Sequence, residues 1–183
     1  MISIHVDDNE YWDGENEVFI PVKGCDLLLE HSLISISKWE SIWHKPYISE
    51  AEKTTDETLS YIKCMTMNKC VDPKVYQFLT GDDYTEIANY INDEHSAVKF
   101  PKEFKNRKVV GDKDEITSEL MYYYMIKFNI PFDCEKWHFK RLLNLIEIFE
   151  FKETPKKKRP VSDMIDERRR KNAERRAKLH TTG

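Results

Sequence analysis

The chain opens with two short segments in which hydrophobic and polar residues alternate. ISIHV (residues 2–6) and EVFIPV (residues 17–22) are rich in β-branched and aromatic side chains, and DGEN (residues 13–16) lies between them. Alternation with a period of two places every second side chain on the same face of a strand, and Asp, Gly and Asn are common turn residues. The pattern predicts a β-hairpin over about residues 2–22.

Hydrophobic residues at helical spacing follow the predicted hairpin. The stripe consists of Leu29, Leu33, Ile36, Trp39 (or Glu40) and Trp43. Spacings of three and four residues line one face of a helix, and Pro46 ends that helix. The shared stripe favours core packing for Trp39 and Trp43. A second interpretation stays open, in which the two tryptophans are an exposed anchor for a partner.

Start signals mark the next two helices. Thr54 and Glu57 have the spacing of a capping box just before LSYIKCM, which predicts a helix near residues 55–67. Asp72 followed by a proline is a second start signal, and it predicts a short helix through VYQFL that Gly81 closes.

A further helix is predicted to begin at Asp82 or Asp83. Its apolar side consists of Tyr84, Ile87, Ala88 and Ile91. Residues 93–114 are polar and lysine-rich without clear periodicity. This segment predicts an exposed loop, with at most a small strand around Val109 and Val110.

The most apolar region, residues 115–151, predicts two helices that Pro131 separates. The first has a stripe of Ile116, Leu120, Tyr123 or Tyr124, and Phe128; the second, capped by Asp133, has Trp137, Leu142, Leu145, Ile146 and Phe149. Because only the short NIPF turn joins them, we expect the two helices to pack against each other as the hub of the fold.

Charge divides the 183-residue chain into two parts. From Lys152 onward there are 12 basic and 5 acidic residues, a net of +7, and the other 17 basic and 28 acidic residues give residues 1–151 a net of −11. DMIDERRRKNAERRAKL near the end favours helix but has almost no apolar face. We therefore expect a mainly α-helical fold with a small N-terminal β-hairpin. One compact acidic domain spans residues 1–151, and a basic linker and C-terminal helix span residues 152–183.

Few residues suggest chemistry. Cys134 and His138 are four residues apart and suit a metal, but tetrahedral zinc needs two more ligands and the chain has no CxxC pair to supply them. No glycine-rich phosphate loop or nucleophile signature occurs, and no apolar run is long enough to span a membrane. We predict no catalytic residue, cofactor or metal. KKKR and RRRK suit phosphates, so nucleic acid stays a candidate partner of the basic tail.

Four segments together resemble a known family. They are LEHSLISISKWESIWHKPYI, DETLSYIKCMT, EITSELMYYYMIKFNIPFDCEKWHFKRLLNLI and RRRKNAERRAKLHTTG. They resemble small proteins encoded in the tail-gene regions of long-tailed phages, which are described as tail assembly chaperones. The resemblance implies a protein of the host cell cytoplasm that binds the tape measure protein, or another phage structural protein, and keeps it soluble.

The resemblance also suggests which residues contact partners. The tryptophans would either line a groove that binds the client or support that groove from within. The basic tail would dock on the client or on another copy. The candidates are Trp39, Trp43, Trp137, Arg168, Arg169, Arg170, Arg175 and Arg176. The alternative is a structural or connector component of the virion, at the junction of head and tail.

Overall fold

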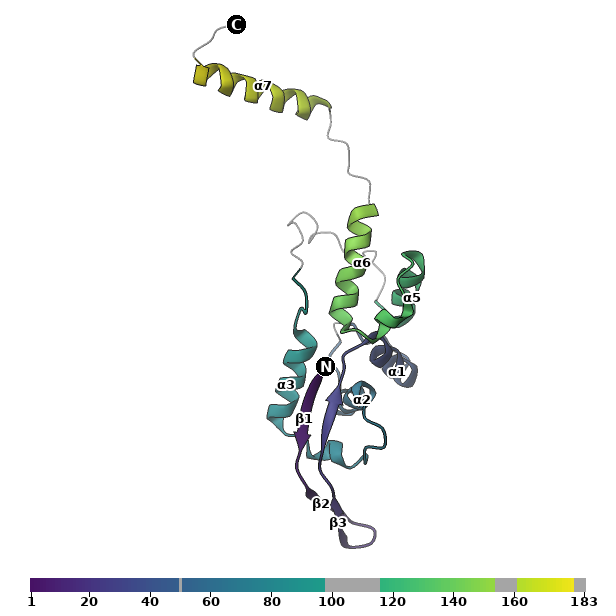
Figure 1. The fold of residues 1–183 in the computed structure, drawn as a ribbon. Coiled ribbons are helices and arrows are strands. Elements are labelled where there is room, and N and C mark those ends of the chain that lie inside the picture. The colour runs from purple at the N-terminus through teal and green to yellow at the C-terminus, as the bar shows by residue number, and fades with distance from the viewer. Residues whose placement is uncertain (50, 98–115, 154–160, 180–183) are drawn as a thin grey trace. The chain divides into compact units, whose positions relative to one another are not determined.

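The computed structural model describes residues 1–49, 51–97, 116–153 and 161–179. It divides into two compact units, Met1–Phe151 and Lys152–Gly183, which we describe separately and call the body and the tail. The body is mainly helical and has an N-terminal antiparallel β element, which confirms the predicted fold class (Figure 1). Among the described residues, no helix is both long enough and apolar enough to cross a membrane.

Four strands, two more than predicted, form the β element. β1 (Ile2–Val6) pairs with β4 (Cys25–Leu29), and β2 (Asn9–Asp13) pairs with β3 (Val18–Val22), both antiparallel. The turn at DGEN therefore exists, but ISIHV pairs with residues 25–29 instead of EVFIPV. Burial explains the pairing, because Leu27 and Leu29 of β4 are fully buried beside Ile4 of β1.

A close backbone approach bends the chain between β3 and β4. The amide of Gly24 donates to the Asp8 carboxylate at 2.7 Å, and a Cβ at residue 24 would collide with the carbonyl oxygen of Val6. Only glycine fits there without a backbone shift.

α1 (Leu33–Trp43) begins later than the apolar spacing predicts. Ser32 is its N-cap and accepts from the amide of Ser35, so Leu29 belongs to β4 and not to the helical stripe. The end of the helix is confirmed, since His44 adopts a left-handed conformation two residues before Pro46. The Ser32 cap and the turn at His44 are local interactions. The pairing of residues 25–29 with β1 is not local, and it outweighs the helical spacing that Leu29 shares with Leu33.

α2 (Thr55–Met65) begins with the predicted capping box of Thr54 and Glu57. The short 3-10 helix η1 (Val75–Phe78) is also confirmed as a helical turn, but its N-cap is Lys74 instead of Asp72, and Gly81 does not close it. Gly81 is instead the first residue of α3 (Gly81–Asn92), whose N-cap is Thr80 in a second capping box with Asp83. The predicted strand around residues 109 and 110 lies outside the described residues.

Of the stripe predicted for α5 (Ser118–Lys127) and its flanks, only Phe128 is buried, and the rest of the buried face lies on other residues. Thr117 caps the helix, and the buried positions are Ser118, Met121, Met125 and, just after the helix, Phe128. Of the predicted stripe, Leu120 and Tyr124 are half-buried and Tyr123 is exposed. The capping bonds at Thr117 fix where the helix starts, and the contact with α1 then selects the face that is buried.

α6 (Phe139–Glu153) starts after a 3-10 helix that the sequence did not predict. This element, η2 (Phe132–Lys136), contains Asp133, so Asp133 does not cap α6, and Trp137 precedes α6 instead of lying in it. The hub of the body is α1, not the pair α5 and α6, because α1 packs against α2, α5 and η2. Phe128 stacks on Phe149 with ring centroids 5.4 Å apart and joins the end of α5 to α6.

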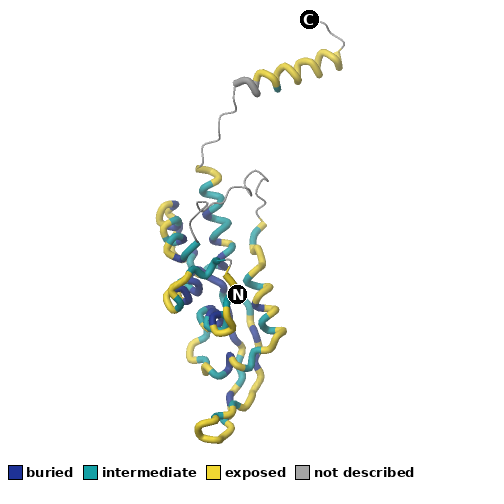
Figure 2. Tube along the Cα trace, turned by 180° about the vertical axis from the view of Figure 1, so that it is seen from behind, coloured by how far each residue is buried: buried dark blue, intermediate teal, exposed yellow. Residues whose placement is uncertain are grey.

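The tail contains α7 (Val161–Leu179), and its described side chains are exposed, except for Glu167, which is partly so (Figure 2). Ile165 and Leu179 are apolar yet 46 % and 71 % exposed. The described part of the tail therefore has no buried core of its own.

Candidate functional site

Trp39 is a packing residue at the centre of the body. Its side chain is 0 % exposed, and its indole nitrogen donates to the carbonyl oxygen of Glu57 in α2 at 2.9 Å. The ring centroid lies 6.2 Å from that of Trp43 and 5.2 Å from that of Tyr47. Trp39 therefore joins α1 to α2 and presents no surface to a partner.

Trp43 is half-buried at the edge of the same cluster. Its indole nitrogen donates to the hydroxyl of Ser60 at 3.0 Å, and the ammonium group of Lys45 lies 5.7 Å from its ring centroid. Lys53 covers the neighbouring Tyr47 ring at 4.6 Å, and burial lowers the pKa of its ammonium group. Two lysines thus cover the outer edge of the tryptophans.

A buried carboxylate holds one of these lysines. Glu57 pairs with Lys45 and also accepts from the amide of Thr54 at 2.9 Å. The hydrogen bond from Lys45 is the main cause that lowers the pKa of Glu57. The same residue therefore caps α2 and fixes the chain that leaves α1.

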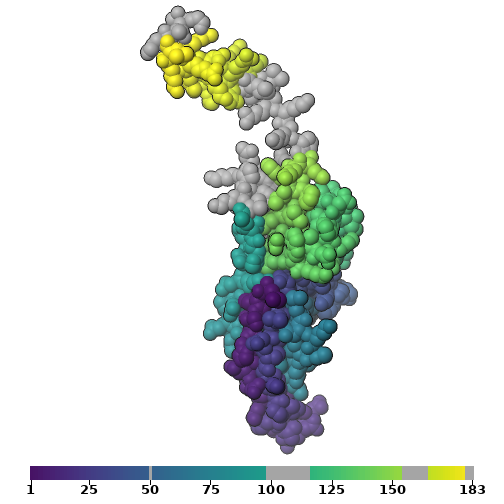
Figure 3. Space-filling view, in the orientation of Figure 1, coloured from purple at the N-terminus to yellow at the C-terminus, as the bar shows by residue number. Residues whose placement is uncertain are grey.

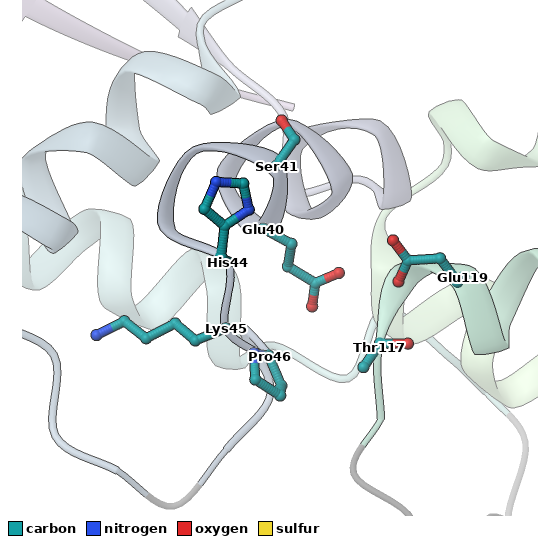
Figure 4. A pocket seen from close by; sticks show the side chains of 7 residues that line it. All are labelled: Glu40, Ser41, His44, Lys45, Pro46, Thr117 and Glu119. Carbon is teal, nitrogen blue, oxygen red and sulfur yellow. The ribbon is translucent and has the colours of Figure 1, made fainter.

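Glu40 connects α1 to α5 beside a shallow pocket of about 370 Å³ (Figure 4). Its carboxylate is 8 % exposed and accepts from the amide of Tyr47 at 2.9 Å and from that of Ser118 at 2.8 Å. The hydroxyl of Ser41, also in the pocket wall, donates to the carbonyl oxygen of Lys38 at 2.7 Å. Both side chains therefore stabilise the local backbone through hydrogen bonds. The lining residues are Glu40, Ser41, His44, Lys45, Pro46, Thr117 and Glu119.

Three histidines that are far apart in the sequence come together in the body, with His31 and His138 buried and His95 exposed. The ring centroid of His138 lies 5.0 Å from that of His31 and 4.1 Å from that of His95. His31 shares a 2.5 Å hydrogen bond with the hydroxyl of Tyr61, and Nε2 of His138 lies 3.2 Å from the carbonyl oxygen of Tyr90. We call these three histidines the histidine cluster.

Burial keeps two members of the histidine cluster neutral at pH 7. Burial first, and the neighbouring histidines second, lower the pKa of His31 to about 3 and that of His138 to about 4. Nδ1 of His138 is buried without a hydrogen-bond partner among the described residues. The cluster joins the start of α1 to the ends of α3 and η2, and no sequence motif marks it.

The structure does not bring Cys134 and His138 into a metal site. Cys134 is buried in η2, and burial raises the pKa of its thiol. The described residues contain no group of three His, Cys, Asp or Glu that could hold a metal ion. Trp137, between these two residues, is half-buried, and the guanidinium group of Arg141 lies 4.3 Å from its ring centroid. Trp137 packs at the edge of the hydrophobic core that contains Trp39, and it forms no ring contact with Trp39 or Trp43 in the described part of the chain.

α5 and η2 expose a set of apolar side chains that we call the α5 face. It consists of Tyr123, Ile126 and Phe132, which are 57 %, 63 % and 55 % exposed. Met121 and Met125 are fully buried on the other side of α5. A surface helix normally presents polar residues opposite its buried stripe, so the α5 face is a candidate binding surface. In the space-filling view of Figure 3, the atoms of α5, in the darker green, lie at the surface beside the lighter green of α6.

The predicted arginines all lie on α7 and are exposed. Some form ion pairs within the helix and the others do not. Arg169 and Arg170 form ion pairs within the helix, with Asp166 at 3.8 Å and Glu174 at 3.9 Å. No ion pair with a described residue is formed by Arg168, Arg175 or Arg176. The ion pairs within α7 therefore neutralise only part of its positive charge.

Comparison of the chain with models of known protein families, with curated proteins and with solved structures found no match.

Proposed function

We propose that this protein is a tail assembly chaperone of a long-tailed phage, which binds the tape measure protein and keeps it soluble in the host cell cytoplasm until the tail tube forms. The observation that carries the proposal is the α5 face. It offers exposed aromatic and aliphatic side chains on a helix that the body holds firmly through Met121 and Met125. A helical client buries its own apolar stripe against such a surface.

The energetics suit a transient partner. Burying a side chain such as Ile126 or Phe132 contributes about 1.5–3 kcal/mol, and tight complexes usually depend on a few such anchors. Three anchors are enough for specific binding, and few enough for release when the tail tube assembles. The tryptophans support this surface from within the body, since Trp39 and Glu40 fix α1, against which α5 packs.

Co-expression with the tape measure protein of the same phage tests the proposal. The client should stay soluble with the wild-type chain and aggregate with the variant Y123S/I126S/F132S. The matched control is I42S/M67S, because these two apolar side chains are also exposed, 58 % and 59 %, but lie outside the α5 face. Circular dichroism and thermal melting establish that both variants are folded.

Two results would contradict the proposal. One is a client that remains equally soluble with the α5-face variant. The other is mass spectrometry that finds the protein in purified virions at a fixed copy number, which would favour the structural or connector role instead. A chaperone is present in infected lysate and absent from mature particles.

A further inference from the structure

α7 separates its charges onto two sides. At 100° per residue, Ile165, Arg168, Arg175, Arg176 and Leu179 fall within a sector of roughly 100°. We call this set the α7 face. It combines the three arginines that lack an ion pair in the described chain with Ile165 and Leu179, which are apolar and exposed.

The intrahelical ion pairs lie on the other side of α7. Besides those of Arg169 and Arg170, Lys171 pairs with Glu167 at 2.8 Å. The described residues therefore neutralise one side of the helix and leave the other side cationic and partly apolar. A surface of this kind suits an acidic partner surface that also contains aromatic rings.

The ribbon of β2 and β3 is such a surface. Trp12 and Phe19 are directly paired across the ribbon, with ring centroids 4.8 Å apart, and they are 49 % and 64 % exposed. Glu10 and Pro21 extend the same exposed face, while Tyr11 on the opposite face packs against the core. We call Glu10, Trp12, Phe19 and Pro21 the ribbon face.

Charge within the ribbon segment has one sign, although Lys23 adjoins it and the ammonium group of Lys74 lies 5.3 Å from the Tyr11 ring on its opposite face. Residues 7–22 contain no lysine or arginine. The acidic residues of this segment are Asp7, Asp8, Glu10, Asp13, Glu15 and Glu17. Asp8 and Asp13 accept hydrogen bonds from nearby amide groups, whereas Glu10, Glu15 and Glu17 extend from exposed positions.

We propose that the α7 face of one copy of this chain binds the ribbon face of a second copy. Arginine forms its strongest ring contacts with tryptophan and pairs with carboxylates at the same time, so Arg168 and Arg175 suit Trp12 and its acidic surroundings. Ile165 and Leu179 provide apolar cover for Phe19. The dimensions agree, because fourteen helical steps from Ile165 to Leu179 span about 21 Å and a five-residue strand about 17 Å.

The two faces differ, so the contact is heterologous. Each copy has one α7 face and one ribbon face, and repeated pairing produces head-to-tail chains or a closed ring. Because much of the attraction is between exposed charges, association should weaken as salt concentration rises. This association does not depend on the function proposed above.

Two full-length variants test the contact by complementation. The α7 variant is R168Q/R175Q/R176Q, and the ribbon variant is E10Q/W12S/F19S. In sedimentation at low salt, the wild-type chain should associate, and each variant alone should associate at least about tenfold more weakly. An equimolar mixture should form a heterodimer and no larger species, because only one intact pair of faces remains. A contact within one chain cannot give this result.

Matched variants separate the faces from general charge effects. R169Q/R170Q/K171Q removes the same number of positive charges from the other side of α7 and should leave association within about twofold of wild type. E10Q/E15Q/E17Q keeps both aromatic rings, so it serves as the ribbon variant if E10Q/W12S/F19S does not fold.

Three outcomes would overturn the proposal. They are a wild-type chain that stays monomeric at low salt, a mixture of the two variants that stays monomeric, and a loss of association in R169Q/R170Q/K171Q equal to that in the α7 variant. Duplex DNA of arbitrary sequence tests the alternative that the α7 face binds nucleic acid. Binding of DNA that requires the α7 face, by a wild-type chain that remains monomeric, would assign this face to phosphates instead.

Discussion

Acidification from pH 7 to pH 5.5 should destabilise the body through the histidine cluster. His31 and His138 are buried as neutral imidazoles with pKa values of about 3 and about 4, against an ordinary value of 6.5. The unfolded chain therefore binds more protons than the folded chain between pH 6.5 and pH 4. Folding stability is complete above pH 6.5 and falls as the pH drops through this window.

The size of the effect follows from the two pKa values. For one histidine that titrates at 6.5 unfolded and at about 4 folded, the free energy of unfolding falls by about 1.2 kcal/mol between pH 7 and pH 5.5. His31 loses a similar amount, so the pair loses about 2.5 kcal/mol if the two sites are independent. A domain with a total stability of about 5–15 kcal/mol feels such a loss clearly.

Urea denaturation followed by tryptophan fluorescence measures the effect at several pH values from 7 to 5.5. In H138Q, the glutamine amide replaces the ring nitrogen near the carbonyl of Tyr90, and the pH-dependent loss should fall by about half. H5Q is the control, because His5 is exposed and a hydrogen bond with Asp26 raises its pKa. Its removal should not reduce the loss.

The comparison between variants also cancels other titrating groups. Burial raises the pKa of Glu147 and of Glu150, which gives an opposite pH dependence in the wild-type chain and in both variants alike. The reasoning is refuted if wild type and H138Q lose the same stability between pH 7 and pH 5.5. It is also refuted if the NMR signal of the His138 ring titrates near pH 6.5.

Three further predictions concern stability. Replacing the fully buried Trp39 with alanine should cost about 3–5 kcal/mol in urea denaturation, and the same change at the half-buried Trp43 should cost less. E40A should lower the free energy of unfolding by about 2–3 kcal/mol, because two backbone amides lose their acceptor, and E40Q should cost less. Truncation before Lys156 should leave the melting temperature of the body nearly unchanged, because the described side chains of α7 are not packed in a core.

Each of these has a contradicting result. Equal costs at the two tryptophans would mean that burial does not set their contributions. An E40A variant as stable as wild type would show that the amides find other acceptors. A truncated chain that melts several degrees lower would show that the tail stabilises the body.

Local structure was predictable from the sequence where it depends on one residue and its near neighbours. The capping box of Thr54 and Glu57, and the end of α1 before Pro46, depend on bonds within about four residues, and both were correct. The prediction failed at Gly81, where the stronger signal was the cap formed by Thr80 and Asp83. The separation of charge between residues 1–151 and 152–183 needs no structure at all.

The candidate surfaces were only partly predictable. Trp39 and Trp43 were named as a pair, but only the structure shows that lysines cover one and that the other is fully buried. Either Tyr123 or Tyr124 was placed on the buried stripe of the helix; Tyr124 is half-buried, whereas Tyr123 belongs to the exposed α5 face. Apolar residues on both sides of a helix give no clear phase, so the contact with α1 decides which side is buried.

The sequence by itself determined the mainly helical class, the capping box that starts α2, the end of α1 and the charge of the two parts, because propensity, capping and charge are properties of short segments. Only the tertiary structure decided that residues 25–29 form β4, that His31, His95 and His138 meet, and that Glu40 accepts from Ser118. These contacts join residues that are far apart along the chain. Their free energy comes from burial and from hydrogen bonds that exist only once distant segments are packed together.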